Sequence, residues 1–211
     1  ADWPQDLTAL PVRAPGFAAH GDTDLDGVDL ATRADPSPSL RVGYDPAQQL
    51  LYVALEVKDD ELENPAGGGA LDSDACQVYV SGLAGDGPGT QPLQYTMVPG
   101  RHTYPGAAGN PALQGGTVGS TRTRGAWKRR GDVTTYEWRV QVFDRYPGQP
   151  TRLESGKVIG FDAVVVDVDG DGEAAWIPWG PAVGDKASSS DRVGRLVLGP
   201  ETGAAGPGAA Q

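Results

Sequence analysis

The chain has 211 residues, of which 38% are hydrophobic, and it contains 31 glycines and 18 prolines. This composition predicts many turns and long loops around a modest core. Acidic residues number 28 against 17 basic ones, so the formal net charge is −11. That charge argues against binding to nucleic acid or to an anionic membrane surface. No apolar run reaches the roughly 18 residues that a membrane-spanning helix needs.

The first half of the chain contains the clearest strand pattern. Residues 39–44 alternate apolar and polar side chains, and after a short turn the alternation resumes over residues 50–58. A period of two places the apolar side chains on one face of a pleated strand. We therefore predict that these segments pair and that the second is the central strand of a sheet. Further strands are predicted at residues 75–81 and 93–98.

The second half of the chain repeats this pattern with one variation. Residues 134–143 alternate between an apolar and a polar face, as in a sheet with one wet side. Residues 158–167 are apolar on both faces, which predicts a strand covered on both sides. Residues 127–130 and 194–198 are predicted as short strands, and residues 176–179 are predicted to begin a loop.

These segments predict an all-β fold, a single antiparallel β-sandwich that is jelly-roll-like and has long Gly/Pro-rich loops. We place this domain over residues 1–198. Residues 199–211 are rich in Gly, Ala and Pro, which predicts a linker to a neighbouring domain beyond the C-terminus. The chain begins at Ala1, not at Met, and contains no signal peptide, so we expect a processed chain or an excised fragment.

Residues suited to catalysis are few. Both histidines, His20 and His102, lie in Gly/Pro-rich stretches, and no nucleophile stands in a recognisable motif. Asp59 and Asp60 are adjacent, so on a strand their carboxylates point apart and cannot act as an acid and base couple. Cys76 is the only cysteine, and it lies on the apolar face of a strand, which predicts a buried and inert thiol. We predict that the protein is not an enzyme.

Two acidic stretches are candidate calcium sites, because calcium takes six to eight oxygen ligands and both resemble the D-x-D-x-D-G opening of calcium loops. The candidate ligands are Asp167, Asp169 and Asp171 in one stretch and Asp22, Asp24 and Asp26 in the other. The Glu that ends an EF-hand loop is replaced by Pro178 and by Arg33, respectively, so neither stretch is an EF-hand. The alternative for both is a solvated turn.

The strands carry short motifs in a collinear order. They run from Asp2-Trp-Pro4 through Leu51-Tyr-Val-Ala-Leu-Glu-Val-Lys-Asp-Asp60, Asp72-Ser-Asp-Ala-Cys-Gln-Val-Tyr-Val80 and Ile159-Gly-Phe-Asp-Ala-Val-Val-Val-Asp-Val-Asp169 to Arg192-Val-Gly-Arg-Leu-Val-Leu198. This order resembles that of family 9 carbohydrate-binding modules and of the wider DOMON-like β-sandwich group. The resemblance implies an extracytoplasmic sandwich that binds an oligo- or polysaccharide, often with structural calcium.

The resemblance also implies a binding slot that clamps the sugar between two tryptophans. One of them matches Trp179, or alternatively its neighbour Trp176, and the other falls at Leu71. Gln77 stands where the family carries an acidic residue, and Thr96 stands where it carries a basic one. The candidate ligand-binding residues are therefore Trp179, Trp176, Gln77, Tyr95 and Leu71.

An aromatic ring binds a sugar by covering the apolar C–H face of the pyranose, while polar neighbours bond its hydroxyls. In an extended segment, residues three apart point to opposite sides. Of Trp176 and Trp179, one is therefore expected in the core and the other at the surface.

Two alternatives stay open. The domain is a sensory or protein-interaction module whose sugar site has degenerated, or it is a b-type haem-binding domain with Met97 and His102 as axial ligands.

Overall fold

The structure is a computed structural model of the chain, and it describes residues 16–17, 37–64, 73–85, 91–99, 104–105, 122–169, 174–182, 186 and 190–200. Its elements are β1 (Gly16–Phe17), β2 (Ser37–Asp45), β3 (Leu50–Lys58), β4 (Ala75–Ser81), β5 (Leu93–Met97), β6 (Tyr104–Pro105), β7 (Arg124–Arg130), β8 (Val133–Val140), β9 (Phe143–Arg145), β10 (Gln149–Pro150), β11 (Val158–Val168), β12 (Ala174–Pro178), the 3-10 helix η3 (Ser190–Arg192) and β13 (Gly194–Val197). Within these ranges the structure contains no helix with the length and hydropathy of a membrane span.

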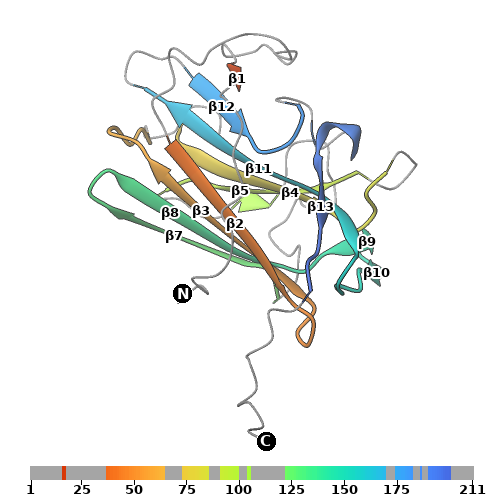
Figure 1. Cartoon of the computed structure of the whole chain (residues 1–211). Helices are drawn as coiled ribbons and strands as arrows, with labels where there is room; N and C mark the ends of the chain where they lie inside the picture. The colour runs from red at the N-terminus through yellow and green to blue at the C-terminus, as the bar shows by residue number, and fades with distance from the viewer. Residues whose placement is uncertain are drawn as a thin grey trace, which may run out of the picture.

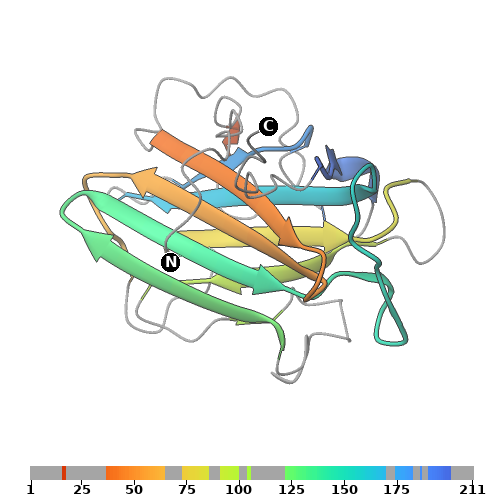
Figure 2. The same cartoon turned by 60° about the horizontal axis from the view of Figure 1, so that its bottom comes forward.

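Two antiparallel sheets lie face to face (Figures 1 and 2). The larger sheet has the order β1-β12-β11-β4-β5-β6, and β13 also pairs with β11. The smaller sheet has the order β2-β3-β8-β7, and β9 and β10 form a separate short pair. We call the face of each sheet that meets the other sheet its inner face. The predicted antiparallel β-sandwich is confirmed.

Strand β3 lies inside the smaller sheet, between β2 and β8, as its alternating sequence predicts. It is joined to β2 by a tight turn in which the Asp45 carboxylate accepts hydrogen bonds from the backbone N–H groups of Ala47 and Gln48, each at 2.8 Å. Gln49 ends the turn with a φ of 56°. This local chemistry fixes the register of the hairpin, so the apolar set of β3 faces the core.

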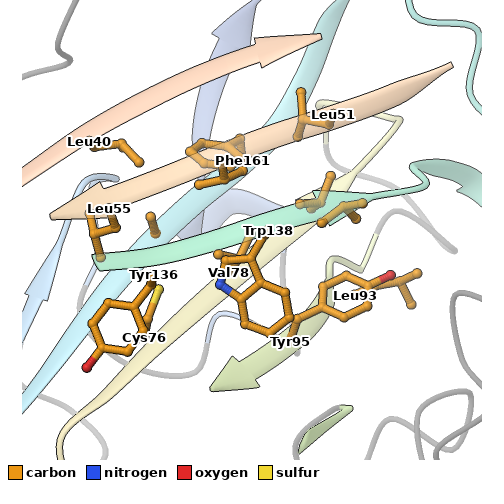
Figure 3. Close-up of a cluster of buried hydrophobic side chains, with 14 of the residues drawn as sticks. Leu40, Leu51, Leu55, Cys76, Val78, Leu93, Tyr95, Tyr136, Trp138 and Phe161 are labelled. Atoms are coloured by element: carbon orange, nitrogen blue, oxygen red, sulfur yellow. The ribbon is translucent and has the colours of Figure 1, made fainter. Parts of the chain in front are cut away.

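The core fills the space between the two sheets (Figure 3). Trp138 of β8 is 2% exposed, and its ring centroid lies 6.0 Å from that of Tyr95 on β5. Cys76 of β4 is fully buried in the same layer. Burial raises the pKa of the Cys76 thiol to about 12. The prediction of a buried thiol is confirmed, and such a thiol stays protonated at neutral pH.

Strand β11 is the long central strand of the larger sheet, and it is buried on both faces, as predicted. One edge pairs with β4, and the other pairs with β12 at one end and with β13 at the other. The prediction that residues 176–179 begin a loop was wrong for its first three residues. They belong to β12, in which Trp176 lies opposite Val166 of β11. Strand β12 ends at Pro178, which has no N–H to donate to a ladder.

Candidate functional site

The outer face of the larger sheet carries a row of polar side chains. Gln77 of β4 and Thr96 of β5 face each other in register, and they alternate with inward-facing core residues. The Tyr79 hydroxyl donates to Gln77 Oε1 at 2.7 Å, and Gln94 Nε2 donates to Thr96 Oγ1 at 3.3 Å. All four side chains are buried, so these bonds hold the amides and hydroxyls in fixed positions.

Trp176 lies on the same outer face as Gln77. Across the sheet, Val164 of β11 is opposite Gln77, and Val166 is opposite Trp176. The half-buried Trp176 ring packs against two small apolar clusters that contain these two valines. The fold therefore brings one predicted aromatic residue and one predicted polar residue to a common face, two strands apart.

Trp179 lies on the opposite side of the larger sheet. Its backbone N–H donates to the Ala163 carbonyl at 2.9 Å, just beyond the end of β12. Its ring meets the buried ring of Phe161 edge-on, with 5.6 Å between centroids. A side chain at Gly194 would collide with the Trp179 ring, so this glycine provides the space that the ring occupies. The half-buried Trp179 thus packs at the rim of the core. The two tryptophans point to opposite sides of the sheet, as predicted.

The remaining predicted ligand-binding residues are not on this face or are not described. Tyr95 lies on the inner face and is 2% exposed. Met97, the predicted haem ligand, lies on the same inner face within the core. Leu71 and His102 lie outside the described residues.

A buried ion pair fixes the segment that joins β12 to β13. Lys186 Nζ lies 2.5 Å from Asp162 Oδ2 and also donates to the carbonyls of Ala182 and Arg192. The other oxygen of Asp162 accepts the backbone N–H of Gly180 at 2.8 Å. Because Asp162 is on the outer face of β11, these bonds hold Gly180, Ala182, Lys186 and Arg192 against that face.

Three buried carboxylates meet at one end of the sandwich. Asp74 precedes β4 and Asp167 is near the end of β11, and the antiparallel pairing of these strands places them side by side. Asp59 follows β3 and comes from the facing sheet. One ligand atom from each lies within 4.8 Å of the others. All three side chains are at most 6% exposed. Sequence reasoning named Asp167 but missed Asp59 and Asp74 as partners.

The charges in this carboxylate cluster are only partly compensated. Asp74 accepts backbone N–H groups of Glu63 and Val168, each at 2.8 Å, yet burial raises the pKa of Asp74 to about 7. Burial also raises the pKa of Asp59, against the effect of Arg129, whose guanidinium is 3.5 Å from the Asp59 carboxylate. Like charges in a buried site are costly unless a proton or a cation neutralises them.

The donor set fits a hard divalent cation. Calcium prefers carboxylate oxygens supplied by several chain segments, and this cluster offers three. Of the predicted calcium loop, Asp169 is described, and its charge contributes to the raised pKa of Asp74. Asp171 and the other predicted set, Asp22, Asp24 and Asp26, lie outside the described residues.

A β-sandwich that holds a tryptophan on the same sheet face as amide and hydroxyl side chains has residue types found in sugar-binding sites. The chain belongs to the carbohydrate family 9 binding domain-like family, whose model matches residues 20–200. The family resemblance predicted from the motif order is confirmed. The predicted linker at residues 199–211 stays a prediction.

Two solved structures show the same fold. The first is a family 9 carbohydrate-binding module from Caldicellulosiruptor kristjanssonii in complex with cellotriose, with a TM-score of 0.63 and 15% identity over 98% of this chain and 89% of that chain. The second is a family 9 module from the same organism in complex with glucose, with a TM-score of 0.59 and 17% identity over 83% of each chain. No relative was found among curated proteins.

Proposed function

We propose that this chain is a non-catalytic carbohydrate-binding module that binds its sugar on the outer face of the larger sheet, beside Trp176. The family consists of binding domains, and the solved structures with this fold hold cellotriose and glucose. The proposed ligand class is therefore a glucose-based oligo- or polysaccharide.

The observation that carries this proposal is the placement of Trp176 and Gln77 on one face. The ring offers an apolar surface for the C–H face of a pyranose. The Gln77 amide and the Thr96 hydroxyl each both donate and accept, as sugar hydroxyls require. Trp176 is the member of this set that solvent already reaches, so we assign it the first contact with the ligand.

Two matched variants test the site, because Trp176 and Trp179 are the same residue type on opposite sides of one sheet. Trp176→Ala is expected to weaken cellotriose binding by roughly tenfold or more, since loss of a stacking ring costs about 1.4 kcal/mol or more. Trp179→Ala is expected to leave the affinity unchanged and to lower the free energy of unfolding by about 2 kcal/mol, because the ring packs on Phe161. Titration calorimetry with cellotriose and glucose, combined with urea unfolding, separates the two effects.

The opposite pattern of affinity loss would restore Trp179 as the ligand-contacting ring. An absence of heat with every soluble sugar would favour the alternative of a sensory or protein-interaction module. A Soret band on the purified protein would favour the haem alternative, although Met97 lies in the core.

We further propose that Asp59, Asp74 and Asp167 hold a structural calcium ion. The support is a buried set of three carboxylates from separate strand ends, whose charges exceed the single guanidinium of Arg129 near Asp59. When bound, the ion would supply the positive charge that this end of the sandwich needs and would join β3, β4 and β11. Mass action then predicts a higher thermal midpoint in millimolar calcium than in chelator. Equal midpoints would contradict the proposal.

The extracytoplasmic location is also a proposal and rests on the family resemblance, whereas a neighbouring domain is a proposal that rests on the Gly/Ala/Pro composition of residues 199–211. The full-length gene that encodes this chain would test both directly.

A further inference from the structure

The outer face of the smaller sheet is basic in a protein whose formal net charge is −11. The register of β2, β3, β8 and β7 aligns the outward side chains in rows across this face, which Figure 2 shows in front of the larger sheet. The rows contain three acidic residues, Asp45, Glu56 and Glu137. The basic residues in the same rows are Arg41, Lys58, Arg124, Lys128, Arg130 and Arg139.

Local ion pairs compensate only part of this charge. Arg41 lies 3.4 Å from Glu56, and Lys58 lies 3.5 Å from Asp132, but both pairs are at the surface and contribute little. Lys128 and Arg130 are exposed and form no ion pair with any described residue. The face therefore keeps an excess of positive charge available to a ligand.

Protection of the sheet edge explains only some of these residues. Strand β7 is an edge strand, and charged side chains on an edge discourage pairing with another chain. Charges of both signs would serve that purpose. Edge protection gives no reason for Arg139, because this residue is on the interior strand β8.

An aromatic side chain lies within the same basic face. Tyr52 of β3 is half-buried, and the register places it between Gly43 and Arg139. Gly43 has no side chain with which to cover the ring from one side. A ring flanked by a guanidinium can cover the C–H face of a sugar while the cation binds an acidic group on the same or the next residue.

We propose that this basic face is a second binding surface and that its ligand is an acidic polysaccharide, with carboxylate groups along the chain. The charge of the face is complementary to such a polymer, and Tyr52 favours a sugar over an acidic peptide. The acidic remainder of the protein does not prevent the contact, because charges more than about 8–10 Å away are screened at physiological salt. The choice of polymer rests on the proposed carbohydrate-binding function, whereas the surface itself is independent of Trp176.

Charge reversal at the edge strand tests this surface with polygalacturonate as the probe. The triple variant Arg124→Glu, Lys128→Glu, Arg130→Glu changes three exposed residues of β7. The control triple variant Arg145→Glu, Arg152→Glu, Arg195→Glu makes the same change of net charge at exposed positions off this face. At low salt, the first is expected to weaken binding by about tenfold or more, and the control by less than about threefold. Binding by the unchanged protein is expected to weaken as salt increases.

Each other outcome has a defined meaning. Equal losses in the two triple variants, or no binding of polygalacturonate by the unchanged protein, would overturn the proposal. Equally tight binding of poly-glutamate that is insensitive to Tyr52→Ala would overturn it in favour of an acidic protein partner. Cellotriose binding separates this surface from the primary site, because it should be lost in Trp176→Ala and retained in the β7 triple variant. Thermal midpoints of all variants check that the fold is intact.

Discussion

Lys186 and Asp162 form a buried ion pair that stabilises the connection between β12 and β13. Both side chains are at most 1% exposed, and Lys186 Nζ has three oxygen partners. Burial raises the pKa of the Asp162 carboxyl, and the Lys186 ammonium opposes that rise. Removal of one partner from such a pair leaves a buried charge without compensation.

Lys186→Met is therefore expected to lower the free energy of unfolding by about 3–5 kcal/mol, measured by urea denaturation. The control is Lys157→Met, because Lys157 is 3.7 Å from Asp144 and both are partly exposed; its cost should be below about 1 kcal/mol. The double variant Lys186→Met, Asp162→Asn should lose less than the sum of the two single losses, since the amide removes the charge and can still accept the Gly180 N–H. Similar costs for the two lysine variants would contradict this role.

At the scale of elements, period-two alternation located β3, β4 and β8, although β8 ends at Val140 and not at the predicted residue 143. The predicted bounds of β3 and β4 agree with the structure, and the pairing of β2 with β3 followed from the short turn between them. Strand β12 was missed because its sequence Ala-Ala-Trp-Ile-Pro does not alternate clearly and ends in proline. Its pairing with β11 depends on the free edge of that longer strand, which a local pattern does not contain.

Hydrogen exchange tests the assignment of β12. The backbone amides of residues 174–177 are expected to exchange slowly, like those of β4, because β12 lies between β1 and β11 in the ladder. The exposed turn at residues 131–132, which joins β7 to β8, provides the fast reference in the same measurement. Exchange of residues 174–177 as fast as this turn would restore the loop that the sequence pattern predicted.

At the scale of the whole molecule, the candidate sites depend on contacts between distant segments. The sequence predicted that Trp176 and Trp179 point to opposite sides, but it could not say which side is the core. Gly194 at the start of β13 identifies Trp179 as the ring on the core side, because the absence of a side chain at Gly194 leaves space for the Trp179 ring. Likewise, Asp74 precedes β4 and lies beside Asp167 because β4 pairs with β11, whereas Asp59 follows β3 and reaches them only because the two sheets stack.

The carboxylate cluster couples the stability of the whole sandwich to pH and calcium. Burial raises the pKa of Asp74 in the folded chain to about 7, above the value of about 4 for an unfolded aspartate. Between these pH values the folded state binds more protons than the unfolded state. The contribution of Asp74 to stability is therefore fully present below about pH 4 and is lost as the pH rises through 7. The raised pKa of Asp59 acts in the same direction.

Calcium competes with the proton for the same oxygens, so its stabilising effect should increase with pH. In chelator, the thermal midpoint is expected to be lower at pH 8 than at pH 6. The increase in midpoint on addition of millimolar calcium should be larger at pH 8. Asp74→Asn should reduce both differences, whereas Asp132→Asn, at the exposed turn between β7 and β8, should preserve them. A calcium effect that is independent of pH, or that persists in Asp74→Asn, would show that the cation binds elsewhere. The raised pKa of Asp74 would then belong to a buried carboxyl group that binds a proton and no metal.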